Sequence, residues 1–200
     1  MEEIEKATMF DVFKNYLDAQ VTLSEAEFAR IKSLAIVKQF TKREFVLREG
    51  EVAGYTNFVT KGLVRLFQTD SHGNEYILKF AHECRWVNDR ESYLSGQPAV
   101  ANIEALEDSE LLTWTKADFD LLLTEVPLFK ELMKTLSAKN QIAAQQRLYA
   151  SMSLSAEERY EQFIAGNPLI INRIPLHMIA AYLGVSRETL SRFRRQAVQK

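Results

Sequence analysis

The sequence predicts an α+β fold in which an N-terminal β jelly roll, a double-stranded β-helix, is followed by one long helix and a C-terminal helix-turn-helix. Three observations support this prediction. Short β-rich segments alternate with turn residues from Ala35 to Trp114, a helical pattern continues without a break after Pro127, and two short apolar helix patterns flank Gly184. We therefore expect three parts: residues 1–125, the linking helix 126–152 and the C-terminal domain 153–200.

The composition is that of a globular protein. Of the 200 residues, 46% are hydrophobic and 26% are charged, which is ordinary for a folded domain and unlike a disordered chain. The first residues lack the basic start and apolar stretch of a secretory signal, and no apolar run approaches the roughly 20 residues that span a bilayer. The one cysteine, Cys84, cannot form an internal disulfide. We expect a cytoplasmic protein with no membrane association.

Residues 2–34 are predicted to be helical, because Phe10, Phe13 and Leu17 recur at helical spacing. Ser24 is placed to cap a second helix.

The segment from Ala35 to Trp114 is predicted to form a barrel of about eight short strands, because runs of β-branched and aromatic residues alternate with glycine and polar turns. The best-defined hairpin turns through Ser71-His72-Gly73, where glycine accepts the positive φ that such turns often need.

A helix of about 26 residues is predicted from Pro127 to Met152, with proline in its first turn. Apolar residues at a 4-3 spacing predict a seam that pairs two copies of the chain. The seam consists of Phe129, Met133, Leu136, Ala143 and Ala150, with Asn140 and Arg147 on the same line. The alternative is a single helix that packs on the barrel.

A shorter helix is predicted from Ser155 to Ala165, with Ser155 and Glu158 as a capping box. The following segment, PLHMIAAYLGVSRETLSRFRRQ, predicts two more helices joined by a tight turn. Pro175 opens the first helix, Gly184 supplies the turn and Ser186 caps the second. Their apolar faces are formed by Leu176, Ile179, Ala180 and Leu183, and by Val185, Leu190 and Phe193. Such a pair is typical of a DNA-binding helix-turn-helix in Pro175–Gln199.

The charge distribution also favours DNA binding by this segment alone. From Arg173 to Lys200 the six basic residues and one acid give +5, which leaves −7 for the rest of a chain whose net charge is −2. Burial of the apolar face turns Arg187, Glu188 and Arg192 outward, where arginine can bind guanine and glutamate can accept from cytosine. We expect these three to read bases. The residues expected to contact phosphates are Ser186, Thr189, Ser191 and Arg195.

With SRETLSR preceded by IAAYLGV, the sequence resembles the Crp/Fnr family of transcriptional regulators. The resemblance implies a cyclic-nucleotide-binding-like sensor domain in residues 1–125, a dimerisation helix in 126–152, a homodimer on palindromic double-stranded DNA, and recruitment of RNA polymerase. Gly50-Glu51, Lys61-Gly62, the glycine hairpin and the long helix all follow the family order.

The predicted effector pocket departs from this family. Where cyclic-AMP-binding members carry a glycine-glutamate pair and, about ten residues later, an arginine-serine pair, this sequence has Asn88-Asp89 and Ala99-Val100. A cyclic phosphate beside Ala99 would lose a charge-assisted hydrogen bond worth roughly 1.5 to 3 kcal/mol. We expect no cyclic AMP binding in the usual way and leave the effector open. The alternative is a rearranged cyclic-nucleotide pocket in which Arg85 and Arg90 compensate.

No cofactor or metal is expected. Cys84 alone cannot hold an iron–sulfur cluster, and His72, His82 and His177 are scattered. A third hypothesis, a cupin-like metalloenzyme, requires clustered histidine and carboxylate ligands that the β segment lacks. Without a nucleophile elbow or phosphate loop, we do not expect an enzyme.

Overall fold

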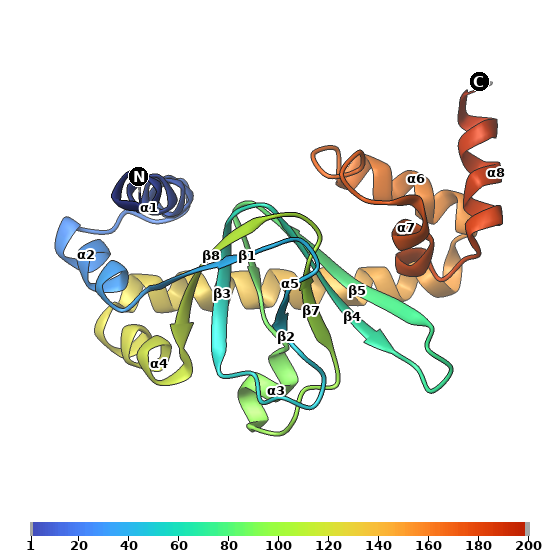
Figure 1. The fold of residues 1–200 in the computed structure, drawn as a ribbon. Coiled ribbons are helices and arrows are strands. Elements are labelled where there is room, and N and C mark those ends of the chain that lie inside the picture. The colour runs from blue at the N-terminus through green and yellow to red at the C-terminus, as the bar shows by residue number, and fades with distance from the viewer. Residues whose placement is uncertain (1, 199–200) are drawn as a thin grey trace. The chain divides into compact units, whose positions relative to one another are not determined.

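Two four-stranded antiparallel sheets form the β part of the chain (Figure 1). The computed structural model describes the backbone of residues 2–198 and the side chains of residues 9–193 and 195, so Gln199 and Lys200 of the predicted C-terminal domain lie outside the described residues. The first sheet has the order β1-β8-β3-β6 and the second the order β2-β7-β4-β5. The strands are β1 (Ile36–Phe40), β2 (Phe45–Leu47), β3 (Tyr55–Lys61), β4 (Leu63–Thr69), β5 (Glu75–His82), β6 (Arg85–Val87), β7 (Asn102–Ala105) and β8 (Ser109–Thr115). The α+β class and the number of strands in this part of the chain are confirmed.

The strands divide their side chains between two cores because neighbours in a strand point to opposite faces. In β3, Val59 belongs to a core that also takes residues from β4, β5 and β7, whereas Phe58 belongs to a core shared with helices. Leu111 and Leu112 of β8 divide in the same way. The first core fills the β-sandwich, and the second attaches the helices to the outer face of one sheet.

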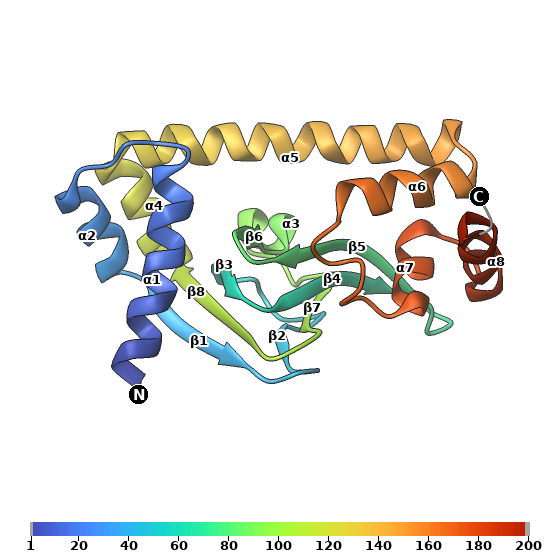
Figure 2. The same ribbon diagram turned by 90° about the horizontal axis from the view of Figure 1, so that it is seen from above.

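The helices that cover this outer face are α1 (Glu2–Asp18), α2 (Glu25–Ser33), α4 (Lys116–Glu125) and the start of α5 (Pro127–Ser153). Figures 1 and 2 show α1, α2 and α4 beside the strands β1 and β8. The fully buried side chains of Phe13 and Leu17 confirm the apolar spacing predicted for α1. Ser24 caps α2 in a capping box with Glu27, as predicted for this serine.

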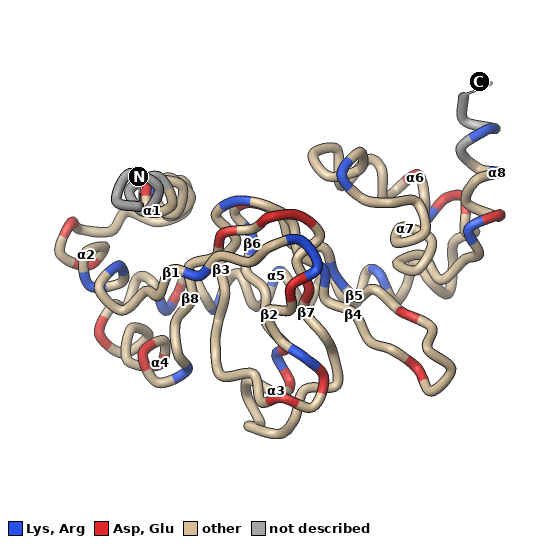
Figure 3. The backbone as a smooth tube through the Cα atoms, viewed as in Figure 1, with Lys and Arg blue, Asp and Glu red and all other residues tan. Residues whose placement is uncertain are grey.

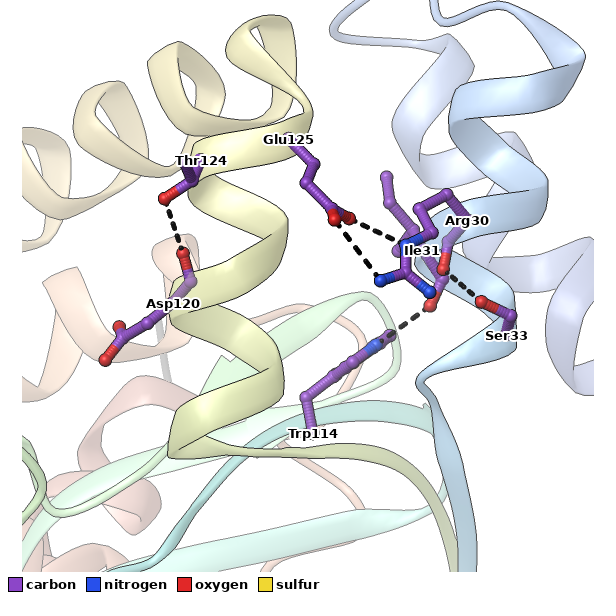
Figure 4. A network of polar contacts seen from close by, with 7 residues as sticks. All are labelled: Arg30, Ile31, Ser33, Trp114, Asp120, Thr124 and Glu125. Carbon is purple, nitrogen blue, oxygen red and sulfur yellow. Dashed lines mark hydrogen bonds and ion pairs between the residues drawn. The ribbon is translucent and has the colours of Figure 1, made fainter.

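Polar contacts fasten α2 to this sheet and to α4 (Figure 4). The Trp114 indole Nε1 donates to the Ile31 carbonyl oxygen at 3.0 Å. Arg30 Nε lies 2.7 Å from Glu125 Oε2. The helical N-terminal segment is thus held by packing, one buried hydrogen bond and one ion pair.

The second sheet contains a buried ion pair between neighbouring strands. Arg65 of β4 lies opposite Glu104 of β7, and its Nη2 and Nε are each 2.6 Å from Glu104 Oε2. The two residues are only 5% and 8% exposed. The guanidinium also lies over the Phe67 ring, with Cζ 3.9 Å from the ring centroid. Sequence patterning did not predict this pair.

The predicted hairpin joins β4 to β5. Asp70 Oδ1 accepts hydrogen bonds from the backbone N–H groups of His72, at 2.8 Å, and Asn74, at 2.9 Å, as in an Asx turn. Gly73 has a φ of +83°, which confirms the need for glycine at this turn.

A short helix that the sequence did not predict, α3 (Arg90–Ser95), follows β6. It has too few residues to show an apolar periodicity. Its cap is Asp89, whose side chain accepts from the Ser92 backbone N–H.

The α5 helix confirms the helix predicted from Pro127. However, part of the seam predicted to pair two copies is packed within the chain and cannot contact a second copy. Phe129 is fully buried, and Met133 and Leu136 pack against the same helix-covered core. In this half of α5, the alternative of packing on the β part is therefore correct, because the apolar face finds its partner within the chain. No helix in the described residues is both long enough and apolar enough to cross a membrane.

The chain divides into two compact units, one of residues 1–68 and 79–136 and the other of residues 69–78 and 137–200. The second unit contains the end of α5, α6 (Ala156–Gly166), α7 (Leu176–Leu183) and α8 (Arg187–Val198). Ser155 caps α6 in a capping box with Glu158, as predicted.

Candidate nucleic-acid interface

The segment with the predicted helix-turn-helix forms two helices and a tight turn. Pro175 stands at the N-cap of α7, and Gly184 at its C-cap has a left-handed conformation with φ +67°. Because a side chain strains that conformation, glycine lets the chain turn sharply. At the start of α8, Ser186 Oγ accepts from the Thr189 backbone N–H at 3.2 Å. Each of the three predicted boundary residues takes its predicted place.

The predicted apolar faces of α7 and α8 form the inside of this segment. Ala180 is 3% exposed, and a small side chain there suits the close approach of two helices. Leu190 is fully buried and Phe193 is 8% exposed. Phe193 also lies 6.5 Å from the Tyr160 ring, between centroids, so α8 packs on α6 as well as on α7.

The opposite face of α8 is open to solvent. The three predicted base readers, Arg187, Glu188 and Arg192, are all exposed. Figure 3 shows basic and acidic positions along α8, next to the less charged α7. The structure therefore brings these three residues onto one accessible helix surface.

The charge of Glu188 is favoured by its position in the first turn of α8. The backbone N–H of Glu188 itself hydrogen-bonds to the carboxylate, and the Ser186 hydroxyl and the Arg187 guanidinium lie near it. Together they lower the pKa of Glu188 below its usual value. The carboxylate is therefore ionised at neutral pH and can accept hydrogen bonds.

The residues predicted to contact phosphates differ in their exposure to solvent and in whether their polar groups are already hydrogen-bonded. Arg195 is exposed, and Thr189 and Ser191 are partly exposed. The Ser186 hydroxyl is exposed but engaged, because it accepts from the Thr189 N–H and donates to Thr189 Oγ1 at 3.1 Å. Arg195 is thus the most available of the four.

Arg159 of α6 is a further residue of this segment, which the sequence did not single out. Its Nη1 donates to the Leu183 carbonyl oxygen at 2.8 Å, which satisfies one of the free carbonyls at the C-terminus of α7. Its Nε is buried and has no hydrogen-bond partner. A cation that interacts with a helix C-terminus can be recognised in a sequence only when it lies in the last turn of the same helix. Here the cation is in α6 and the carbonyl is in α7, 24 residues later.

The predicted effector residues precede and follow α3, but they do not form one polar cluster. Ala99 is 2% exposed and belongs to the core of the β-sandwich, whereas Val100 is 53% exposed. Asn88 Nδ2 donates to Thr56 Oγ1 at 3.3 Å. Asp89 is 6% exposed; its Oδ1 accepts from the Ser92 N–H at 3.1 Å, and its Oδ2 is buried without a partner.

Ser92, which the sequence did not single out, ties α3 to two loops. Its hydroxyl accepts from the Ala53 N–H at 2.9 Å and donates to the Gln97 carbonyl at 2.6 Å. A serine in a six-residue helix carries no pattern that distinguishes this role.

The three histidines and Cys84 remain apart from any metal-like arrangement. Within the described residues, no group of three histidine, cysteine, aspartate or glutamate side chains is placed to hold a metal ion. Burial is the main cause that raises the pKa of the Cys84 thiol, with the neighbouring Glu83 charge second, so it is a poor thiolate at neutral pH.

Residues 37–125 match the family model of the cyclic nucleotide-binding domain. Solved structures show the same fold over most of the chain. The Thermus thermophilus Catabolite Activator Protein aligns with a TM-score of 0.57 and 25% identity, over 88% of this chain and 84% of that chain. The chain has a Crp/Fnr-like fold.

Two other structures with the Crp/Fnr-like fold extend the comparison. FixK2 from Bradyrhizobium japonicum has a TM-score of 0.72 and 21% identity, over 82% of this chain and 85% of that chain. The c-di-GMP-responsive global regulator CLP from Xanthomonas campestris has a TM-score of 0.68 and 14% identity, over 88% and 92%. No curated protein sequence matches the chain. The family resemblance predicted from the sequence is confirmed.

Proposed function

We propose that this chain is a sequence-specific DNA-binding transcriptional regulator that works as a homodimer in the cytoplasm and has no enzymatic activity. One observation carries the proposal: α8 buries Leu190 and Phe193 while it presents Arg187, Glu188 and Arg192 to solvent. A helix of 12 residues is about 18 Å long and fits the major groove of B-DNA.

The chemistry of the exposed face supports direct reading of bases. Arginine donates two parallel hydrogen bonds to guanine O6 and N7, and glutamate accepts from cytosine N4. The ionised carboxylate of Glu188 suits the second role. Ser186, Thr189, Ser191 and Arg195 are assigned to the phosphates on either side, where they fix the position of α8 in the groove.

The proposed dimer uses a different seam of α5 from the one that the sequence predicts. The side of α5 opposite Phe129 carries Ile142, Tyr149 and Met152, which are 53%, 68% and 73% exposed. Tyr149 lies seven residues after Ile142, and Met152 lies three residues after Tyr149, so the three residues fit the a and d positions of a coiled coil. Pairing along this line buries apolar side chains that have no partner within the described part of the chain.

A two-fold dimer predicts a palindromic target with half-sites about one helical turn, roughly 34 Å, apart. The test is selection of genomic fragments by the purified protein, followed by footprinting of the bound fragments. We expect an inverted repeat. Failure to enrich any sequence would contradict the proposal. RNA polymerase is the proposed partner at the promoters so identified.

The base-reading assignment is tested with Arg187→Ala on the selected site. Loss of one bidentate contact weakens binding by about 1–3 kcal/mol and relaxes the preference at one base pair. Arg48→Ala is the matched control, because Arg48 is also exposed and lies in the first unit. Equal affinity of wild type and Arg187→Ala would reject the assignment.

We propose further that any effector of the β-sandwich is not cyclic AMP bound in the usual way. In place of the phosphate-binding arginine stands Ala99, buried in the apolar core of the sandwich. A second candidate function, a cyclic-nucleotide-responsive regulator with a rearranged pocket, is favoured by the family match of residues 37–125. Calorimetry with cyclic AMP and cyclic GMP separates the two: heat at low micromolar ligand that disappears in Asp89→Ala would establish the second.

A further inference from the structure

A cavity of about 550 Å³ lies in the second unit, and none of its lining residues belongs to α8. This volume is within the range of small-molecule sites, roughly 300 to 1,000 Å³. The walls come from the start of β5, the end of α5, α6 and α7. Ile77, Phe163 and Leu183 give it an apolar floor.

The charged groups at this cavity are all positive. Arg147 and Arg159 line it, and no aspartate or glutamate is among the lining residues. Arg147 is exposed, and within the described residues its side chain has no hydrogen bond or ion pair. Two cations on an apolar cavity favour an anionic occupant, because charge complementarity is strengthened where water is partly excluded.

The guanidinium of Arg159 has donor capacity that the chain does not satisfy. Its Nη1 holds the Leu183 carbonyl, but its Nε is buried and unpartnered. A buried donor without a partner is unfavourable, because it has lost its hydrogen bonds to water. Such groups in native proteins usually have a ligand, ion or water as their partner.

The cavity also offers an aromatic wall. The rings of Phe163 and Tyr182 lie 4.9 Å apart between centroids, at an interplanar angle of 47°. Both residues line the cavity. A flat apolar body is accommodated by such a pair better than a compact hydrated ion.

We propose that this cavity is a binding site for a small organic anion with an apolar or aromatic body. The anionic group pairs with Arg147 and Arg159, and the body lies against Phe163 and Tyr182. Because Arg159 also holds the last turn of α7, the bound anion acts on the turn at Gly184 that leads into α8. The proposal does not depend on DNA binding or on an effector in the β-sandwich.

The test is calorimetric titration of the full chain with naphthalene-2-sulfonate and with naphthalene-2-sulfonamide, which have similar shape and differ in charge. We expect the sulfonate to bind at least about tenfold more tightly than the sulfonamide, because only the sulfonate pairs with the arginines. Arg147→Gln should weaken sulfonate binding by at least about tenfold. Ala150→Phe, which fills the cavity without a change of charge, should abolish binding of both probes.

Arg192→Gln is the matched control, because it removes one exposed arginine from α8 in the same unit. Its sulfonate affinity should equal that of the wild type. Equal binding of sulfonate and sulfonamide, unchanged binding by Arg147→Gln, or an equal loss in Arg192→Gln would each overturn the proposal. The Arg147 side chain is exposed and makes no hydrogen bond within the described residues, so its variant should fold; circular dichroism checks this.

Discussion

The indole N–H of Trp114 donates to the Ile31 carbonyl oxygen at 3.0 Å, and both residues are fully buried. The neighbouring residue Arg30 is on the surface and forms an ion pair with Glu125 at 2.7 Å, with side chains that are 40% and 39% exposed. The first contact joins α2 to β8 and the second joins it to α4, and only the second is accessible to water.

We predict that Trp114→Phe destabilises the protein much more than Arg30→Gln. The first change leaves a buried carbonyl without a donor, which costs about 1–3 kcal/mol. The second removes a half-exposed ion pair worth about 0–1 kcal/mol. Urea unfolding followed by circular dichroism measures both, and a larger loss in Arg30→Gln would contradict this ranking.

We predict that Gly62→Ala is more destabilising than Gly184→Ala, although both glycines have positive φ, +96° and +67°. A Cβ on Gly62 would stand 2.7 Å from the Ser109 Cα, so backbone must move. A Cβ on Gly184 would have nothing within 4 Å. Gly184→Ala therefore shows the conformational cost alone, about 1–2 kcal/mol. Equal thermal unfolding temperatures of the two variants would show that the Ser109 contact is relieved without cost.

The capping box of α6 should make stability depend on pH. The Ser155 backbone N–H and hydroxyl hydrogen-bond to the Glu158 carboxylate and lower its pKa. Since the folded state favours the ionised form, its contribution is complete above the ordinary glutamate range near pH 4 to 5 and is lost as pH falls through the lower folded pKa.

Wild type should therefore be more stable than Glu158→Gln at pH 7, and the difference should shrink as pH falls below about 4. Thermal unfolding at a series of pH values measures it. Glu161→Gln, an exposed change in the same helix, controls for the loss of one negative charge. A difference that stays constant down to pH 3 would reject the assignment.

The proposed dimer seam predicts that Ile142→Glu weakens self-association at least about tenfold, because two carboxylates would be buried together. Asn140→Glu is the matched control. It lies two residues earlier, about 160° around the helix, and is also exposed. Light scattering across protein concentrations measures both. If Asn140→Glu dissociated the dimer and Ile142→Glu did not, the result would contradict this seam and favour the seam first predicted from the sequence, which contains Asn140.

Local patterns predicted most of the helical boundaries and the number of strands. Ser24, Ser155, Pro175 and Gly184 each act through the backbone of their nearest neighbours, so their roles follow from residue type and spacing. The exposed face of α8 followed in the same way from Leu190 and Phe193.

Contacts between distant segments were not predictable from one sequence. Phe129 fits a pairing seam and a core equally well by spacing, and only the position of β8 and α1 decides for the core. Arg159 and Leu183 are 24 residues apart, and neither has a pattern that points to the other. The cavity beside them depends on how four elements meet.

The buried pair of Arg65 and Glu104 limits how this sheet can change over evolutionary time. Loss of either partner leaves a bare charge between strands, at a cost of about 3–5 kcal/mol, whereas an apolar pair of similar volume is tolerated. Substitution of Arg65 or Glu104 alone is therefore strongly disfavoured, whereas simultaneous replacement of both by apolar residues is tolerated. Among relatives of this chain, residues 65 and 104, which are 39 positions apart, should covary.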